Sequence, residues 1–181
     1  ISNAKNKCLS SKQLEDDAKN DEEKIIAKIY KRYRNSLSKN NALDFDDLIL
    51  FPVLLLRQNK SVRDYWHRKF KHILIDEYQD TNQTQYELIK LITSNKNNTN
   101  ELIDWDNRSI FVVGDADQSI YSFRAADFTI LMNFRKDFNN NPELSEVPLI
   151  KLEKNYRSTS NILNAANKLI ENNADRIDKV L

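Results

Sequence analysis

Glycine is almost absent from this chain of 181 residues, because Gly114 is the only one. A phosphate-gripping loop of the form G-x-x-x-x-G-K-[ST] and a dinucleotide-binding turn of the form G-x-G-x-x-G each require at least two glycines. Both motifs are therefore excluded within these residues.

Cysteine and histidine are equally scarce, with Cys8, His67 and His72 as the only examples. One cysteine excludes an internal disulfide and a cysteine-based zinc site, and it favours a reducing, intracellular compartment, with cytoplasm, nucleus and a DNA-containing organelle equally compatible. Two histidines cannot build a metal cluster alone. No apolar run approaches the roughly 18 residues of a membrane span, so we expect no membrane partner.

An excess of charge of either sign is also missing, since 28 basic and 27 acidic residues leave a net charge of +1. No overall field attracts the chain to nucleic acid, so any such site has to be local. The chain starts with Ile1 and stops within a helical pattern at Leu181. We therefore expect an internal fragment whose partner is the remainder of a longer polypeptide.

Apolar residues at intervals of three and four predict a series of helices. Pro52 should kink or divide the second of them, and Ser61 to Asp64 resembles a capping box at the start of the third. The predicted helices cover residues 21–37, 44–57, 61–70, 85–92, 127–138 and 162–170.

Three short, β-branched runs predict buried strands at residues 72–75, 109–113 and 148–152. Strands that alternate with helices indicate an α/β fold with a parallel sheet and flanking helices. Functional side chains should then gather at the carboxyl ends of the strands. Two asparagine-rich inserts, at residues 94–107 and 139–148, are predicted to be surface loops.

Asp76 and Glu77 directly follow the first predicted strand. Adjacent carboxylates at such a position suit phosphoryl transfer, in which one holds Mg²⁺ and the other polarises a water molecule. The same two residues are also compatible with a simple strand end that caps the helix after Thr81. Both interpretations stay open on these residues alone.

The second strand leads to Gln118, Tyr121, Phe123 and Arg124. The glutamine lies where it would reach a γ-phosphate or its water, and the other three side chains suit a platform on which nucleic acid bases stack. Tyr121 and Phe123 are also compatible with core aromatics. After the third strand, the pair Tyr156–Arg157 suits base stacking and anion binding.

Five segments occur together in the order and approximate spacing of the UvrD/PcrA/Rep superfamily 1 DNA helicases. The resemblance extends over the whole chain except the asparagine-rich inserts. The segments are residues 1–6, 43–48, 75–81, 113–124 and 152–158.

The fold implied by this resemblance is a partial RecA-like (P-loop NTPase) parallel sheet with flanking helices and a helical segment from an inserted subdomain. Residues 1–43 would end a helical insertion of the 1B type, and residues 44–147 would form the second half of the first, 1A-like motor domain. Residues 148–181 would begin the second, 2A-like motor domain. The phosphate loop would lie outside this chain.

The function implied by the resemblance is ATP hydrolysis coupled to 3′-to-5′ translocation on single-stranded DNA and to duplex unwinding, for example in DNA repair. ATP and Mg²⁺ would be the cofactors. Asp76 would hold the metal and Glu77 would be the catalytic base. Gln118 would contact the γ-phosphate, Tyr156 would stack on adenine, and Arg157 would act as an arginine finger.

DNA contacts are implied for Tyr121, Phe123 and Arg124, with single-stranded DNA and junctions of single- and double-stranded DNA as partners. Relatives commonly carry Trp at the position of Phe123 and Gly at that of Ala125, so a smaller platform and a less free turn are expected. Without a phosphate loop, residues 1–181 alone should hydrolyse ATP poorly.

Two other functions compete with the helicase interpretation. One is a metal-dependent nuclease with a two-metal cluster formed by Asp76, Glu77, Asp80, Asp115 and Asp117. The nuclease would leave the segments around Gln118 and Arg157 without a role. The other is a catalytically inactive interaction module that keeps the helicase fold.

Overall fold

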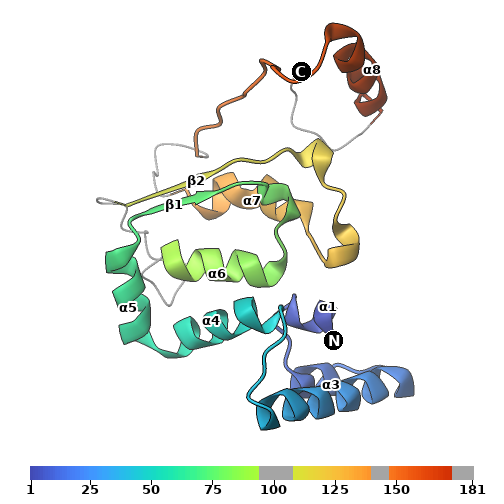
Figure 1. Cartoon of the computed structure of the whole chain (residues 1–181), viewed down its shortest axis with the longest axis vertical. Helices are drawn as coiled ribbons and strands as arrows, with labels where there is room; N and C mark the ends of the chain where they lie inside the picture. Colours follow the sequence, from blue (N-terminus) through green and yellow to red (C-terminus); the bar gives the residue numbers. More distant parts are fainter. Residues whose placement is uncertain (94–107, 140–146, 173–181) are drawn as a thin grey trace.

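The computed structural model describes residues 1–93, 108–139 and 147–172, apart from the side chain of Arg124 (Figure 1). Most of the two predicted asparagine-rich loops therefore lies outside the described residues. In chain order the helices are α1 (Ser2–Lys5), α2 (Ser11–Asp16), α3 (Asp21–Lys39), α4 (Asp47–Gln58), α5 (Lys60–Lys69), α6 (Gln83–Thr93), α7 (Phe128–Asp137) and α8 (Ser160–Ile170). Three short 3-10 helices, η1 (Tyr78–Asp80), η2 (Ala116–Gln118) and η3 (Ser122–Arg124), lie between them.

Two strands form a parallel sheet, as the sequence predicted. Strand β1 (His72–Ile75) pairs with β2 (Ser109–Val112), and Leu74 lies opposite Phe111 in the register. The third predicted strand is wrong, because residues 148–152 form no strand. A strand needs a neighbour to pair its backbone groups, and the described part of the chain offers this segment none. The described residues therefore show an α/β arrangement with a small sheet.

One face of the sheet is covered and the other is open. Ile75, Ile110 and Val112 pack against the core cluster, which α6, α7 and η1 supply. The cluster contains Tyr78, Tyr86, Ile89, Ile130, Phe134 and Phe138. On the opposite face Leu74 is 74% exposed and Phe111 is 52% exposed. The apolar alternation of the strands thus separates a buried face from an exposed one.

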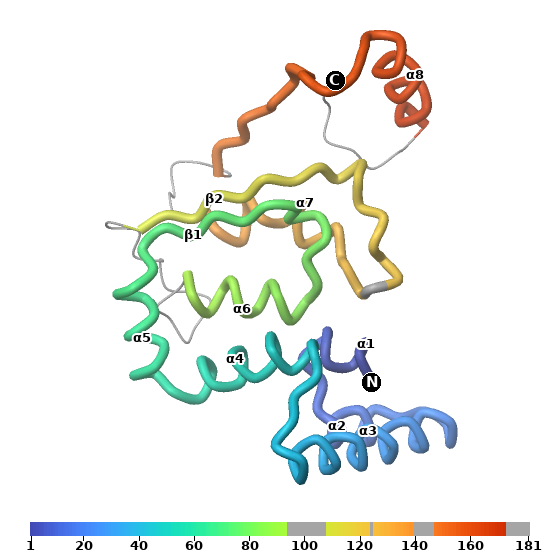
Figure 2. Tube along the Cα trace, in the orientation of Figure 1, coloured from blue at the N-terminus to red at the C-terminus, as the bar shows by residue number. Residues whose placement is uncertain are grey.

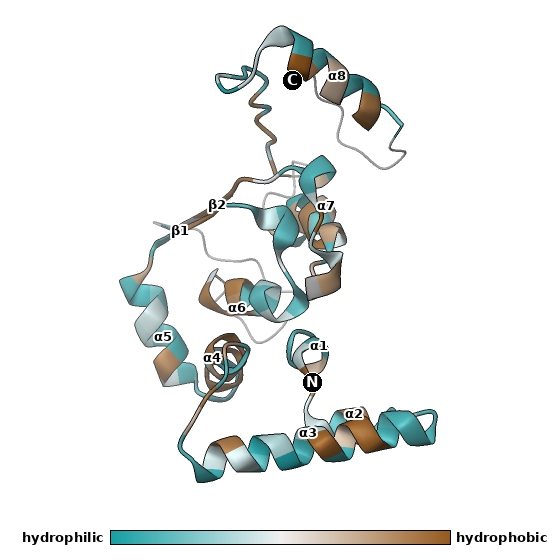
Figure 3. Ribbon diagram, turned by 45° about the vertical axis from the view of Figure 1, so that its right-hand side comes forward, coloured by the Kyte–Doolittle hydropathy of each residue, from teal (hydrophilic) through white to brown (hydrophobic). Residues whose placement is uncertain are grey.

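The helical layer beyond the sheet is built by α4, which packs against α6 and α5. Figure 3 shows α4 as strongly apolar, and Pro52 does not divide it. Helix α5 starts one residue earlier than predicted, and Asn59 accepts the backbone N–H of Val62, so the capping box at Ser61 is wrong. Of the described helices, none is long and apolar enough to cross a membrane.

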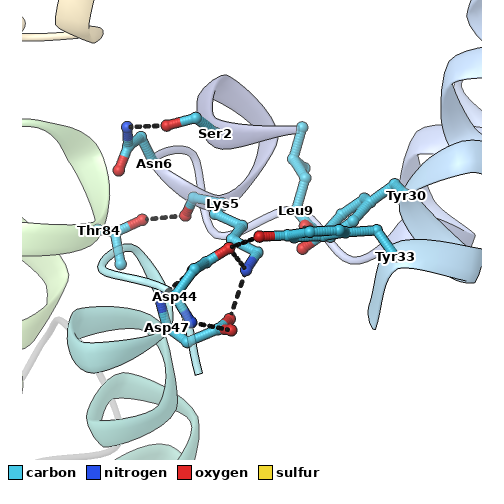
Figure 4. Close-up of polar contacts among 9 residues, drawn as sticks. All are labelled: Ser2, Lys5, Asn6, Leu9, Tyr30, Tyr33, Asp44, Asp47 and Thr84. Carbon is cyan, nitrogen blue, oxygen red and sulfur yellow. Dashed lines mark hydrogen bonds and ion pairs between the residues drawn. The ribbon is translucent and has the colours of Figure 1, made fainter. Parts of the chain in front are cut away.

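A buried ion cluster ties the beginning of the chain to α4 (Figure 4). Lys5 is fully buried, and its Nζ lies 2.7 Å from Asp44 Oδ2 and 2.7 Å from Asp47 Oδ1. The hydroxyl of Tyr33 donates to Asp44 at 2.9 Å. The three charged side chains, which we call the Lys5 cluster, therefore join α1 to the start of α4, and Tyr33 ties α3 to the same cluster.

The same segment also contacts the start of α6, and Figure 2 shows the blue N-terminal end beside that helix. The Thr84 hydroxyl donates to the carbonyl of Lys5 at 2.6 Å, and the Thr84 N–H donates to the carbonyl of Asn6 at 3.1 Å. The side chain of Asn82 donates to Asn6 Oδ1 at 3.2 Å. Residues that are about 80 positions apart in sequence thus position the helix that follows the predicted catalytic strand end.

Candidate functional site

The carboxyl ends of β1 and β2 meet at one edge of the sheet. The N–H of Val113 donates to the carbonyl of Ile75 at 2.8 Å, and the N–H of Tyr78 donates to the carbonyl of Val113 at 2.9 Å. The turn after β1 is therefore bonded directly to the turn after β2. Asp76 and Glu77 lie in the first turn, and the segment from Gly114 forms the second.

Asp76 and Glu77 are both exposed at this edge. The N–H of Glu77 donates to Asp76 Oδ1 at 2.9 Å. Glu77 has φ 50° and ψ 43°, a left-handed conformation that is uncommon for a residue other than glycine. Among the described residues no lysine, arginine or histidine forms an ion pair with either carboxylate. The edge therefore presents negative charge that the described chain does not neutralise.

Asp80 completes the first turn in a less exposed position. Burial, and then the negative charge of Glu77, raise the pKa of its carboxyl above the usual value. Its Oδ1 is buried and has no hydrogen-bond partner among the described residues. A raised carboxyl pKa beside a second carboxylate is typical of a functional site, although ion networks also produce it.

A shallow pocket lies beside this turn and has a volume of about 330 Å³. The carboxylates of the turn form one side, and apolar residues of α6 form the other. Its lining residues are Ile75, Asp76, Glu77, Asp80, Thr81, Gln85, Leu88 and Ile89. The strand end and α6 therefore enclose space next to the predicted metal ligand.

The turn after β2 carries Asp115 and Gln118. The side chain of Asp115 caps η2 by accepting the N–H of Asp117 at 3.0 Å, and its other oxygen accepts Nε2 of Gln118 at 2.7 Å. Gln118 is exposed, so its amide lies at the surface of the same edge. The structure thus brings Asp76, Glu77 and Gln118 onto hydrogen-bonded neighbouring turns.

Tyr121 and Phe123 follow within the next few residues, with their ring centroids 5.8 Å apart. Phe123 is 71% exposed, which makes it unlike a core aromatic. Ala125 adopts φ 62° although it is not a glycine, so the chain accepts a backbone cost of the order of 1 kcal/mol there. The side chain of Arg124 lies outside the described residues.

Tyr156 and Arg157 are not brought to this edge. Tyr156 is 85% exposed beneath Nζ of Lys154, and the N–H of Arg157 donates to the side chain of Asn155. Within the described ranges no hydrogen bond or ion pair joins either residue to the turn after β1 or β2. Figure 1 shows α8 apart from α6 and α7. Any role of this pair in the site requires a movement or another part of the protein.

Sequence reasoning missed two contributors to the site, Gln79 and the Lys5 cluster. Gln79 is buried, with 2% exposure, and its amide bonds both turns. The sequence feature that could have predicted its role is its position close to two carboxylates in the turn that follows a predicted strand. For Lys5, the sequence feature that could have predicted the contact is the acidic pair Asp44 and Asp47. These two residues are three positions apart on one side of a helix start, where a cation would neutralise both.

Comparison with known proteins gives one family. Residues 1–139 match the sequence profile of the UvrD/REP helicase N-terminal domain. ATP-dependent DNA helicase Rep of Buchnera aphidicola subsp. Acyrthosiphon pisum is 46% identical over all 181 residues, which are 25% of that protein. ATP-dependent DNA helicase PcrA of Staphylococcus aureus is 42% identical over the same 181 residues, which are 22% of it. The chain therefore spans about a quarter of the length of these relatives.

Proposed function

The chain belongs to the UvrD/REP helicase family, and from this premise we propose that it is the part of an ATP-dependent DNA helicase that carries its water-activating and metal-binding carboxylates. The parent protein would couple ATP hydrolysis to 3′-to-5′ translocation on single-stranded DNA and to unwinding at junctions. Its sheet would be the second half of a RecA-like motor domain. The domain boundaries near residues 43 and 147 belong to the same proposal.

The observation that carries this proposal is the shared edge of the sheet. Asp76 and Glu77 follow β1, and Gln118 follows β2, on turns that hydrogen bond to each other. Ligands of open parallel sheets bind at the carboxyl ends of the strands. Three side chains suited to phosphoryl transfer thus lie where a nucleotide would be expected.

The residues at this edge fit a magnesium ion that is held mainly by water and phosphate. In the part of the chain that the structure describes, no group of three His, Cys, Asp or Glu side chains could hold a metal by itself. Mg²⁺ keeps several waters and usually takes one or two carboxylates together with substrate phosphates. The exposed carboxylate of Asp76 suits that role, and the ion would neutralise charge that develops on the phosphates.

Glu77 would act as the general base, because it lies next to Asp76 and projects from the same turn. A base has to hold one orientation to accept a proton from water. The left-handed backbone of Glu77 and the hydrogen bond from Gln79 Nε2 to its Oε2, 2.7 Å long, supply this orientation. Gln118 would contact the γ-phosphate from the neighbouring turn.

DNA would lie on the segment that follows Gln118. Tyr121 and the exposed Phe123 provide aromatic surface, on which bases stack with about 1 to 3 kcal/mol each regardless of sequence. Arg124 would contact the same strand. Tyr156 and Arg157 would complete the nucleotide site from the second motor domain when the two domains close.

The two other functions gain no support from the described residues. A two-metal nuclease needs Asp76, Glu77, Asp80, Asp115 and Asp117 to converge, and no three of them form a group able to hold a metal. An inactive module would give the exposed carboxylates of Asp76 and Glu77 no ligand to bind.

The test is DNA-stimulated ATP hydrolysis by the full-length protein and its Glu77→Gln variant. Loss of the base should lower turnover by about 10² to 10⁴-fold and leave nucleotide affinity within about 3-fold. Glu22→Gln, an exposed position in the first turn of α3, is the matched control. Unchanged turnover in Glu77→Gln, or lost binding with unchanged rate, would refute the assigned role.

A further inference from the structure

Gln79 occupies the junction between the two turns of the site. Its side chain is 2% exposed, and both ends of its amide are used. Nε2 donates to Glu77 Oε2 at 2.7 Å, and Oε1 accepts the backbone N–H of Asp115 at 3.0 Å. A buried amide with both ends bonded is costly to move, because each lost bond leaves an unsatisfied polar group.

The only glycine of the chain makes room for this amide. A Cβ at Gly114 would lie 2.9 Å from Oε1 of Gln79 and 3.3 Å from the backbone nitrogens of Gln79 and Tyr78. Gly114 does not have a positive φ, so its conformation alone does not demand glycine. Because the Gln79 turn approaches so closely, a side chain at this position would force the Gln79 amide to shift.

The Glu77 end of the bridge is held by its own turn. Glu77 has the left-handed backbone, and its carbonyl accepts the N–H of Asp80 at 3.0 Å. The bond from Gln79 Nε2 then holds the Glu77 carboxylate against the Gln79 amide. Gln79 thus limits the orientations of the proposed base.

The other end of the bridge leads to the proposed DNA-contacting segment. Asp115, whose N–H donates to Gln79, also accepts Nε2 of Gln118. The Ser119 hydroxyl lies 3.4 Å from the carbonyl of Gln79. Tyr121 follows two residues later. A displacement of this segment therefore acts on the Gln79 amide before it reaches Glu77.

We propose that Gln79 is a positioning residue that couples the orientation of Glu77 to the segment after β2, so that DNA binding there regulates the base. This inference rests on the proposed function of Glu77. The path is a chain of packed hydrogen bonds, Glu77–Gln79–Asp115–Gln118, rather than a distant correlation.

Gln79→Glu in the full-length protein tests the Glu77 end of the bridge. The variant keeps an acceptor for the N–H of Asp115 but replaces the donor to Glu77 Oε2 with a second carboxylate, which repels the Glu77 carboxylate. DNA-stimulated kcat should fall by about 10-fold or more, while the KM for ATP changes by less than about 3-fold. Gln83→Glu adds the same charge at an exposed residue of α6 and should leave both constants unchanged.

Gly114→Ala tests the same bridge without removing a polar group. The added methyl should displace the Gln79 amide and lower DNA-stimulated kcat by about 10-fold or more, while the KM for ATP changes by less than about 3-fold. In a Gln79→Ala background, where the amide is gone, the same substitution should add little further loss. Thermal unfolding of each variant identifies any that fail to fold. If Gln79→Glu does not fold, the double-mutant cycle of Gly114→Ala and Gln79→Ala provides the test instead.

An unchanged kcat in folded Gln79→Glu, or additive losses in the cycle, overturns the inference. Glu77→Gln separates this failure from that of the proposed function. If Glu77→Gln is inactive while the Gln79 and Gly114 variants behave as wild type, Glu77 keeps its role and the coupling is wrong. If Glu77→Gln is fully active, the proposed function itself fails.

Discussion

Two acidic pairs in this chain have opposite surroundings. Asp44 and Asp47 enclose the ammonium group of Lys5 at 2.7 Å each. Asp76 and Glu77, at the end of β1, are exposed and form no ion pair among the described residues. The first pair is neutralised by a lysine of the same chain, and the second pair is exposed to solvent.

The difference is the one expected between a structural acidic pair and the proposed functional pair. Buried charges persist only when they are paired, and the Lys5 cluster satisfies this with an ion pair and a hydroxyl donor, Tyr33. An exposed pair of ionised carboxylates at a strand end has little desolvation cost, because water surrounds it. The pair therefore stays available to a cation that water and phosphate also coordinate. Substitutions in the two pairs should therefore affect different measurements.

The largest expected effect is on stability, in Lys5→Met. The change leaves Asp47, which is 2% exposed, and Asp44 without their cation, and the loss should be about 3 to 5 kcal/mol. Native-state hydrogen exchange of α1 and α4 amides in the full-length protein measures this loss of stability. Lys7→Met, at an exposed residue of the same segment, should change it by less than about 0.5 kcal/mol. Equal protection in both variants would show that the Lys5 cluster is not stabilising.

The next effect is on metal use, in Asp76→Asn. The Mg²⁺ concentration for half-maximal ATP turnover should rise by about 10 to 100-fold, while hydrogen exchange of α1 and α4 stays unchanged. Asp21→Asn, an exposed carboxylate of α3, is the control. A normal Mg²⁺ requirement combined with faster exchange would reverse the roles given to the two pairs.

A smaller effect is expected for Asp44→Asn, and it depends on pH. Burial alone would raise the pKa of Asp44, but hydrogen bonds from Lys5, the Asp47 backbone and Tyr33 outweigh it and hold the pKa below the usual 3.8. Ionised Asp44 therefore stabilises the fold above pH 3.8, and this contribution is lost as the pH falls through the folded pKa. Asp44→Asn should cost about 1.5 to 3 kcal/mol at neutral pH and progressively less in acid. A constant difference at all pH values would contradict the ion pair.

The smallest effect, with the opposite sign, is expected for Asp80→Asn. Burial and the charge of Glu77 raise the folded pKa of Asp80 above 3.8, so its ionisation disfavours the fold as the pH rises through that pKa, and the penalty is absent below 3.8. Removing the charge should stabilise slightly at neutral pH and not in acid. Urea unfolding at two pH values, with Asp21→Asn beside it, measures the sign. Destabilisation at neutral pH would mean that Asp80 has a cationic partner.

The elements that local pattern controls were predictable from the sequence. Strands β1 and β2 were confirmed because short β-branched runs end in polar turns, and α3 was confirmed because its apolar residues recur at helical spacing. The strand predicted at residues 148–152 was wrong because strand formation depends on a partner, which periodicity does not reveal. The cap of α5 was misplaced by a few residues because Asn59 competes with Ser61.

The site was predictable only in part. Adjacency of Asp76 and Glu77 to Gln118 follows from the parallel order of two strands. The bridge through Gln79 could not be predicted, because it depends on how closely the two turns approach each other. The single glycine, Gly114, indicates a close approach at its position, but the sequence does not show which residue approaches it. Likewise Lys5 meets Asp47 across 42 positions, a contact that tertiary packing alone determines. The roles of Tyr156 and Arg157 stay predictions.

The most direct test of the account asks which acidic pair receives the metal. Fe²⁺ can replace Mg²⁺ in the full-length protein with ATP bound, and ascorbate with peroxide then cleaves the backbone close to the ion. We expect ATP-dependent cleavage next to Asp76 and Glu77, none at Asp44 and Asp47, and loss of the cut in Asp76→Asn. Cleavage at residues 44–47, or cleavage near residue 76 that persists in Asp76→Asn, would contradict the assignment.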